Sequence, residues 1–276
     1  MADGRHINKI LSHVRRAVDD YGMIEDGDRI AVGVSGGKDS LTLLCALEAL
    51  SRFYPRKFTV VPVFLDTALP DFDPSPIYSL CESLSLVPAV VYTEIYRIVF
   101  ELRGEKNPCS LCALLRRGAL NDAALANGCS KVALGHHFDD AVETFMMNLF
   151  NEGRIGCFSP VSYLDRKKIT VIRPLIYIEE KEIKSFVRRA GIATVEKHCP
   201  ADGNTDRERI KRLLSSMEAE DRGLKRRIFG AMARGEISGY HVSEGRGRKT
   251  KERTAPGSPP ETGGREAGAE NTGPEV

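Results

Sequence analysis

The sequence lacks any apolar run long enough to cross a membrane, and its first residues lack the hydrophobic stretch of a secretory signal peptide. We therefore expect a cytoplasmic protein with no membrane partner. A strong charge of one sign is also missing, because 40 Lys and Arg residues oppose 38 Asp and Glu residues and leave a net charge of +2. A surface for nucleic acid must then be local. Seven cysteines in a reducing compartment are better explained as ligands, nucleophiles or core residues than as disulfides.

The alternation of apolar segments predicts an α/β fold. Strands separated by helical segments are expected at 30–34, 58–65, 89–92, 131–134 and 170–172. This alternation favours a Rossmann-like parallel sheet with helices on both faces. Four segments are expected along the chain: an N-terminal helix and turn at 1–28, an α/β domain at 29–200, a charged helical extension at 201–242, and a tail at 243–276 that is too polar to fold.

The hexapeptide Ser35-Gly36-Gly37-Lys38-Asp39-Ser40 joins the first expected strand to the next helix. Glycines let the backbone approach a ligand closely, and the amides at a helix start point towards an anion. The Lys38 side chain adds a positive charge, and the Ser35 and Ser40 hydroxyls add donors. The simpler alternative is a tight turn with a Ser or Asp helix cap. The spacer of a Walker A loop is absent, and the hexapeptide instead resembles the pyrophosphate loop of enzymes that split ATP between its α and β phosphates.

Two further polar groups follow expected strands. Asp66 ends the second strand, and Gly135-His136-His137-Phe138-Asp139-Asp140 leaves the fourth. The carboxyl ends of parallel strands share one edge of the sheet, so we expect both groups near the hexapeptide. Asp139 and Asp140 can bind Mg²⁺ on ATP or cap the following helix, and we expect one carboxylate for each task. The histidines fit structural roles as well as catalytic ones, and Glu143 lies one turn further along the helix.

The pair Cys109 and Cys112 places two thiols on one face at the start of a helix. Such a pair can be a redox couple, half of a zinc site or part of an iron–sulfur site. A metal site needs more ligands, and Cys199, with His198 beside it, is the best candidate. The other cysteines fall in or beside apolar segments and are expected in the core, except for Cys157, which has no evident role; the core set is Cys45, Cys81 and Cys129.

Taken in order, these motifs resemble those of tRNA 2-thiocytidine synthetases. The resemblance covers roughly residues 5–215 and includes Asp26 to Ile30, the hexapeptide, Cys109 to Cys112 with Leu115 to Gly118, Gly135 to Asp140, Arg173 to Leu175, and Cys199 with Asn204 and Arg207. Membership implies a PP-loop ATP pyrophosphatase fold of the adenine nucleotide α-hydrolase type. It also implies a 4Fe–4S cluster held by Cys109, Cys112 and Cys199, with the fourth iron open to sulfur or a small ligand.

The resemblance further implies an ATP-dependent tRNA-cytidine sulfurtransferase that forms AMP and pyrophosphate. ATP and Mg²⁺ would bind at the hexapeptide, and O2 of a cytidine at anticodon-loop position 32 would attack the α phosphorus. Sulfur from a cysteine desulfurase, delivered at the open iron, would then replace the adenylated oxygen. Catalytic roles are assigned to Lys38, Asp39, Asp139 and Asp140, and nucleotide contacts to the hexapeptide, Asp66, Gly135 and His136.

The partner implied by this family is tRNA, and a homodimer is expected by analogy alone. The phosphates of tRNA would meet local basic groups at Arg116–Arg117, Lys167–Lys168, Arg188–Arg189 and within 207–227. Taken singly, each of these charge runs is more often a solvated helix face.

Three alternatives remain at the level of sequence. A cluster-free adenylating enzyme of the same fold, such as a tRNA lysidine synthetase, would not need the three cysteines. A related tRNA uridine thiolase usually adds zinc fingers, for which this chain has no further Cys-x-x-Cys pair. A non-catalytic zinc- or cluster-binding RNA protein would leave the hexapeptide and the Asp139–Asp140 pair unexplained.

Overall fold

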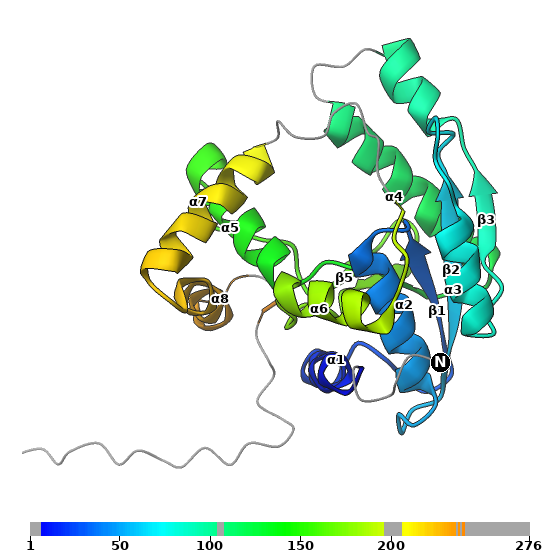
Figure 1. The fold of residues 1–276 in the computed structure, drawn as a ribbon, viewed down its shortest axis with the longest axis horizontal. Coiled ribbons are helices and arrows are strands. Elements are labelled where there is room, and N and C mark those ends of the chain that lie inside the picture. The colour runs from blue at the N-terminus through cyan, green and yellow to red at the C-terminus, as the bar shows by residue number, and fades with distance from the viewer. Residues whose placement is uncertain (1–6, 104–107, 196–205, 236, 238, 241–276) are drawn as a thin grey trace, which may run out of the picture. The chain divides into compact units, whose positions relative to one another are not determined.

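The computed structural model describes residues 7–103, 108–195, 206–235, 237, 239 and 240 (Figure 1). The expected tail at 243–276 and the expected ligand Cys199 lie outside these residues. The described elements, in chain order, are α1 (Asn8–Asp20), β1 (Asp28–Val34), α2 (Lys38–Ser51), β2 (Phe58–Asp66), α3 (Ser75–Ser83), β3 (Ala89–Tyr92), the π-helix η1 (Arg97–Arg103), α4 (Pro108–Ala126), β4 (Lys131–Ala133), α5 (Phe138–Glu152), β5 (Val161–Leu164), β6 (Ile169–Ile172), α6 (Glu180–Ala190), α7 (Asp206–Glu220) and α8 (Leu224–Arg234).

The strands form one six-stranded sheet in the order β3-β2-β1-β4-β6-β5. The pairs β1–β2, β1–β4, β2–β3 and β4–β6 are parallel, which confirms the predicted α/β architecture. The edge strand β5 was not expected, and it pairs antiparallel with β6, so the sheet is not parallel throughout. The turn between them is polar, and Lys168 in it adopts a φ of 49°, which closes the hairpin.

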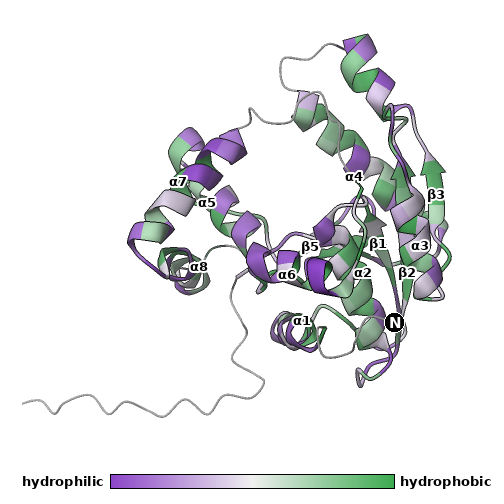
Figure 2. Ribbon diagram, viewed as in Figure 1, coloured by the Kyte–Doolittle hydropathy of each residue, from purple (hydrophilic) through white to green (hydrophobic). Residues whose placement is uncertain are grey.

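Helices cover both faces of the sheet, as predicted. On one face, Leu120, Ala123 and Ala124 of α4 pack against inward residues such as Ala31 and Val63. On the other face, the apolar sides of α1, α2, α3, α5 and α6 share the larger core with alternate residues of β1 and β2. Figure 2 shows hydrophobic residues concentrated in the central strands and α2, whereas α6 and α7 carry many hydrophilic ones. None of the described helices is both long enough and apolar enough to cross a bilayer.

The charged segment that begins at Asp206 is two helices rather than one. Gly223, with a φ of 87°, reverses the chain between α7 and α8. Both helices pack against α5, and the ring centroids of Phe138 on α5 and Phe229 on α8 lie 4.9 Å apart. Ile210 and Leu214 are the buried side chains of α7. The C-terminal helices are therefore fixed against the helix that follows β4.

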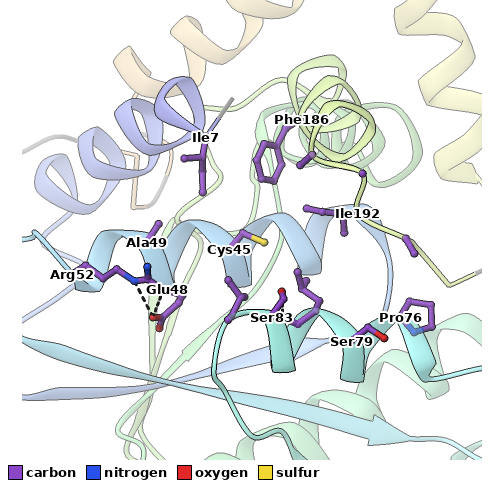
Figure 3. Close-up of a pocket in the computed structure, with 15 residues that line it drawn as sticks. Ile7, Cys45, Glu48, Ala49, Arg52, Pro76, Ser79, Ser83, Phe186 and Ile192 are labelled. Atoms are coloured by element: carbon purple, nitrogen blue, oxygen red, sulfur yellow. Dashed lines mark hydrogen bonds and ion pairs between the residues drawn. The ribbon is translucent and has the colours of Figure 1, made fainter. Parts of the chain in front are cut away.

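A hollow of about 700 Å³ lies between α2, α3 and α6 (Figure 3). Its walls are mostly apolar and include Cys45, Phe186 and Ile192, while Glu48 and Arg52 form an ion pair beside it. The α2 residues Cys45 and Glu48 lie two to three turns after Lys38, where the helix begins. At 1.5 Å per residue they are more than 10 Å along the helix from its first residue.

A buried ion pair joins β1 and β4 at the opposite edge of the sheet. Lys131 Nζ lies 2.7 Å from Asp28 Oδ2, and the two side chains are 9% and 8% exposed. Asp28 also accepts a hydrogen bond from the amide of Glu25, and Lys131 donates to the carbonyl of Met23. The Asp28 carboxylate thus organises the turn that leads into β1.

Replacement Lys131→Met should lower the free energy of unfolding by about 3–5 kcal/mol, because it leaves the Asp28 carboxylate buried without its counter-ion. Urea unfolding at pH 7 measures the change. In the double variant Asp28→Asn/Lys131→Met most of the loss should be recovered, since no unpaired charge remains. A single variant within about 1 kcal/mol of the wild type would show that water, not Lys131, stabilises Asp28.

Candidate nucleotide site and thiol pair

The hexapeptide lies at the centre of the carboxyl edge of the sheet. β1 and β4 are neighbours there, and the chain leaves them towards opposite sides, to β2 after β1 and to the β5–β6 hairpin after β4. Such a switch point is where open α/β sheets bind ligands. The polar groups predicted to follow β1 and β4 are thereby brought together, and Asp66 ends β2 on the same edge.

The N-cap of α2 is Gly37, which has no side chain with which to cap the helix. The Ser40 hydroxyl instead donates to the Gly37 carbonyl at 2.9 Å and accepts from the Ser35 amide at 3.1 Å. The predicted alternative of a Ser or Asp cap is therefore not what forms here. These hydrogen bonds tie Ser35 and Gly37 to the first turn of α2, and first-turn amides of α2 remain available to an anion.

Two glycines allow the loops to approach one another closely. Gly36 has a φ of 76°, and a Cβ atom there would lie 2.4 Å from Cγ2 of Val195. The Val195 amide donates to the Gly36 carbonyl at 2.9 Å, which fixes the loop from behind. A Cβ atom on Gly135 would lie 3.1 Å from the carbonyl carbon of Asp39, so the loop after β4 packs directly on the start of α2.

Lys38 is held by two carboxylates. Its Nζ lies 3.0 Å from Asp39 Oδ2 and 3.1 Å from Glu180 Oε1 at the start of α6. Burial alone would lower the pKa of Lys38, but the two neighbouring carboxylates more than offset it and the pKa is raised. Lys38 is therefore a cation at physiological pH.

The two aspartates after β4 are not arranged as we expected. We expected one carboxylate to cap a helix and the other to face the phosphates of ATP. Asp140 forms a capping box with His137: its Oδ2 accepts from the His137 amide at 3.0 Å, and its own amide donates to His137 Nδ1. Asp139 is buried and accepts from the Glu180 amide at 2.7 Å and from Lys225 Nζ at 2.8 Å. Both carboxylates thus cap helices, α5 for Asp140 and α6 for Asp139.

The electrostatics of Asp139 agree with this geometry. Burial alone would raise its pKa, yet the hydrogen bond from the Glu180 amide and the charge of Lys225 lower it below the ordinary value. Asp139 is therefore ionised, and its carboxylate links α5 to α6 and to α8.

The histidines after β4 face different surroundings. His137 Nδ1 accepts a hydrogen bond, so in the neutral ring Nε2 carries the proton and faces Asp39 Oδ1 at 3.7 Å. Asp39 Oδ1 is buried and has no hydrogen-bond partner among the described residues. The His136 ring contacts that of Phe158, with centroids 4.9 Å apart and the planes tilted by 40°. Burial, with the nearby charge of Arg173, lowers the pKa of His136 to about 4. His136 is neutral at physiological pH.

Residues from α6, α7 and α8 complete the site. Arg207 of α7 donates to Asp140 Oδ1 at 3.2 Å, Lys211 contacts Glu180, and Lys225 of α8 contacts Asp139. Sequence reasoning treated Lys211 and Lys225 only as RNA-binding charges, gave Arg207 also as part of the family resemblance, and gave Glu180 no role. No local motif identifies Glu180, because its partners are distant in the sequence.

Glu143 lies within the same group and is only 3% exposed. Burial and the neighbouring Asp140 carboxylate raise its pKa to about 7, against the opposing charge of Arg207, whose Nη1 lies 3.7 Å away. The net charge of this centre therefore changes near neutral pH.

Among the cysteines, the thiol pair differs from the core residues. Cys109 is exposed and Cys112 half-buried in the first turns of α4. The predicted core cysteines Cys45, Cys81 and Cys129 are all buried, which confirms that expectation, and burial raises the pKa of each thiol. Within the described part of the chain no three His, Cys, Asp or Glu side chains are arranged to hold a metal ion.

Comparisons with known proteins agree with this arrangement. Residues 6–217 match the family model described as a PP-loop domain. The chain is 43% identical over 233 residues to a tRNA-cytidine(32) 2-sulfurtransferase of Geobacter sulfurreducens, covering 83% of this chain and 91% of that protein. The corresponding enzyme of Syntrophotalea carbinolica is 36% identical over 245 residues, covering 88% and 94%.

A solved structure with a similar fold is the U34-tRNA thiolase NcsA from Methanococcus maripaludis with its 4Fe–4S cluster. Its TM-score is 0.67 at 21% identity, covering 82% of this chain and 78% of that chain. This likeness supports the PP-loop arrangement of strands and helices.

Replacement Gly36→Ala should destabilise the protein by more than about 2 kcal/mol, because the new Cβ meets Val195 and the φ is positive. Gly22→Ala is the matched control: Gly22 has a φ of 58° with open space around it, so the expected loss is about 1 kcal/mol. Thermal and urea unfolding of both variants measure the difference. Equal losses of stability in the two variants would mean that a clash with Val195 contributes nothing to the destabilisation by Gly36→Ala.

Replacement Glu143→Gln should stabilise the protein increasingly as the pH rises. The folded-state pKa of Glu143 lies above its unfolded value, so its ionisation costs stability between about pH 4.5 and pH 7, and glutamine does not ionise. The unfolding free energy of the variant, relative to wild type, should rise by up to about 3 kcal/mol from pH 5 to pH 8. The exposed Glu152→Gln on the same helix is the control, and a pH-independent difference for Glu143→Gln would contradict the assignment.

Proposed function

Because the chain belongs to the PP-loop family of tRNA-cytidine(32) 2-sulfurtransferases, we propose that it uses ATP to activate O2 of a tRNA cytidine and replaces that oxygen with sulfur. The observation that carries the proposal is the hexapeptide at the switch point between β1 and β4, with Lys38 at the start of α2. The target is cytidine 32 of the anticodon loop.

The first step is adenylation of the base. O2 of the cytidine attacks the α phosphorus of ATP, the bond to the bridging oxygen breaks, and pyrophosphate leaves. The first-turn amides of α2 and the Lys38 ammonium face the charge that develops on the leaving group, which is where preorganised donors lower a barrier most. To do so Lys38 must exchange its contacts with Asp39 and Glu180 for contacts with phosphate oxygens.

Of the aspartates assigned to catalysis, Asp39 fits Mg²⁺ best. Its Oδ1 has no hydrogen-bond partner among the described residues, whereas both oxygens of Asp139 are engaged by Glu180 and Lys225. In ATP sites Mg²⁺ is commonly bound by one or two carboxylates together with phosphate oxygens, and Asp39 lies within the hexapeptide. His137 Nε2 lies 3.7 Å from Asp39 Oδ1 and 3.5 Å from Asp140 Oδ2.

A 4Fe–4S cluster would be held by Cys109, Cys112 and Cys199. The first two thiols suit it, because they lie three positions apart at an accessible helix start, while Cys45, Cys81 and Cys129 are buried. When bound, the cluster supplies iron that binds and delivers sulfur. In the second step sulfide attacks C2 of the adenylated base, the C2–O2 bond breaks, and AMP leaves with O2.

The sulfur would originate from a cysteine desulfurase, and the reaction would take place in the cytoplasm, where tRNA is modified. Arg116 and Arg117 follow the thiol pair on α4 and are suited to tRNA phosphates near it. A homodimer remains part of this proposal.

The thiol pair and the phosphate loop can be tested separately. Cys109→Ala should abolish thiolation of tRNA and the visible absorption of the cluster, while ATP binding stays within about twofold of wild type. Lys38→Ala should lower ATP turnover by about 10²–10³-fold and leave iron and sulfide content unchanged. Cys81→Ala, which removes a buried thiol, is the control.

The measurements are iron, sulfide and zinc content of protein purified without oxygen, and mass-spectrometric detection of 2-thiocytidine in tRNA. Full sulfur transfer by Cys109→Ala would refute the cluster-dependent route. Anaerobic protein with no metal would instead favour a cluster-free adenylating enzyme such as a lysidine synthetase.

A further inference from the structure

Three lysines converge on the carboxylate of Glu180. Its Oε1 lies 3.1 Å from Lys38 Nζ and 3.2 Å from Lys211 Nζ, and its Oε2 lies 3.1 Å from Lys211 and 3.2 Å from Lys184. The Glu180 side chain is 13% exposed. These cations come from three helices, α2, α7 and α6, and they meet beside the phosphate loop.

The single carboxylate of Glu180 cannot neutralise the positive charges of the three lysines around it. Burial alone would raise the pKa of Glu180, but the hydrogen bonds and charges of Lys211, Lys38 and Lys184 lower it to about 2. Glu180 therefore carries one full negative charge. Asp39 compensates Lys38 in part, which leaves Lys211 and Lys184 to share the remaining carboxylate.

Lys211 and Lys38 are close enough to bind one polyphosphate chain. Since each Nζ contacts the same Oε1 atom, the two nitrogens are at most about 6.3 Å apart. The pKa of Lys211 is raised because, although burial and the charge of Lys38 would lower it, the carboxylates of Glu180 and Glu143 prevail. Lys211 is a cation at physiological pH.

The position of Lys211 is set by the packing of α7. Ile210 beside it and Leu214 are buried, and Arg207, one turn earlier on the same face, is paired with Asp140. Lys184 differs, since its side chain is 58% exposed and it contacts Glu180 from within its own helix at i,i+4 spacing. The Lys211 side chain is 35% exposed and reaches across from another element.

We propose that Lys211 is a second phosphate-binding residue of the nucleotide site, which binds the β and γ phosphates of ATP together with Lys38. The proposal rests on the ATP-dependent function above. Both lysines contact the Glu180 carboxylate, and they exchange it for phosphate oxygens when ATP binds.

The test compares the binding of MgATP and of AMP to the full-length protein by calorimetry in the absence of tRNA. Lys211→Gln should weaken binding of MgATP by about tenfold and leave the affinity for AMP within about twofold, because AMP lacks the β and γ phosphates. Lys211→Arg, which keeps the charge, should retain most of the MgATP affinity. Lys184→Gln is the matched control and should bind both nucleotides as the wild type does.

The inference fails if Lys211→Gln binds MgATP like the wild type while Lys38→Ala does not, and the proposed function then stands. It also fails if Lys211→Gln loses ATP and AMP equally, because a general distortion of the site would then explain the effect. A wild-type protein that binds no ATP would overturn both the inference and the proposed function.

Discussion

The site depends above all on the buried carboxylate of Asp139. One of its oxygens accepts the hydrogen bond of the first α6 amide, and the other contacts Lys225 on α8. Because the Glu180 amide is that donor, Asp139 fixes the residue whose own carboxylate contacts Lys38 and Lys211. A carboxylate at a helix start is favoured by the free amides and by the helix dipole, so this contact costs little despite its burial.

The charged centre around Asp139 is assembled from segments that are distant in the sequence. Its carboxylates come from α2, α5 and α6, and most of its cations come from α7 and α8. Partly buried ion pairs of this kind add little net stability, since desolvation opposes their attraction. These ion pairs do require a defined geometry. Together with the packing of α7 and α8 on α5, they hold the two C-terminal helices beside the hexapeptide.

The fold was predictable from the sequence wherever a local pattern decided it. The expected strands and the helices between them all form, because each apolar run is buried on a face of the sheet. The strand β5 was not predicted, because its four residues, mostly half-exposed, show no sustained alternation of apolar and polar side chains that would indicate a strand. They form a strand because they pair with β6. Likewise Gly223 divides the expected C-terminal helical segment, a break that depends on its left-handed conformation.

The site was predictable only in part. The hexapeptide and the loop after β4 each contain their polar residues within a short segment that a local motif reveals. Because both segments follow parallel strands, their proximity at one edge of the sheet follows from the topology. The role of Asp139 does not, because its partners are an amide 41 positions away and a lysine 86 positions away. From the sequence alone, a carboxylate that caps its own helix and one that caps another helix look the same.

The attachment of α7 has a consequence for how binding events in this protein influence one another. α7 begins at Asp206, seven positions after Cys199, and its Arg207 and Lys211 are tied to Asp140 and Glu180. A ligand of the preceding segment that displaces α7 changes those ion pairs, and so changes the affinity of the loop for nucleotide. Thermodynamic reciprocity then requires nucleotide to change the affinity for that ligand by the same factor.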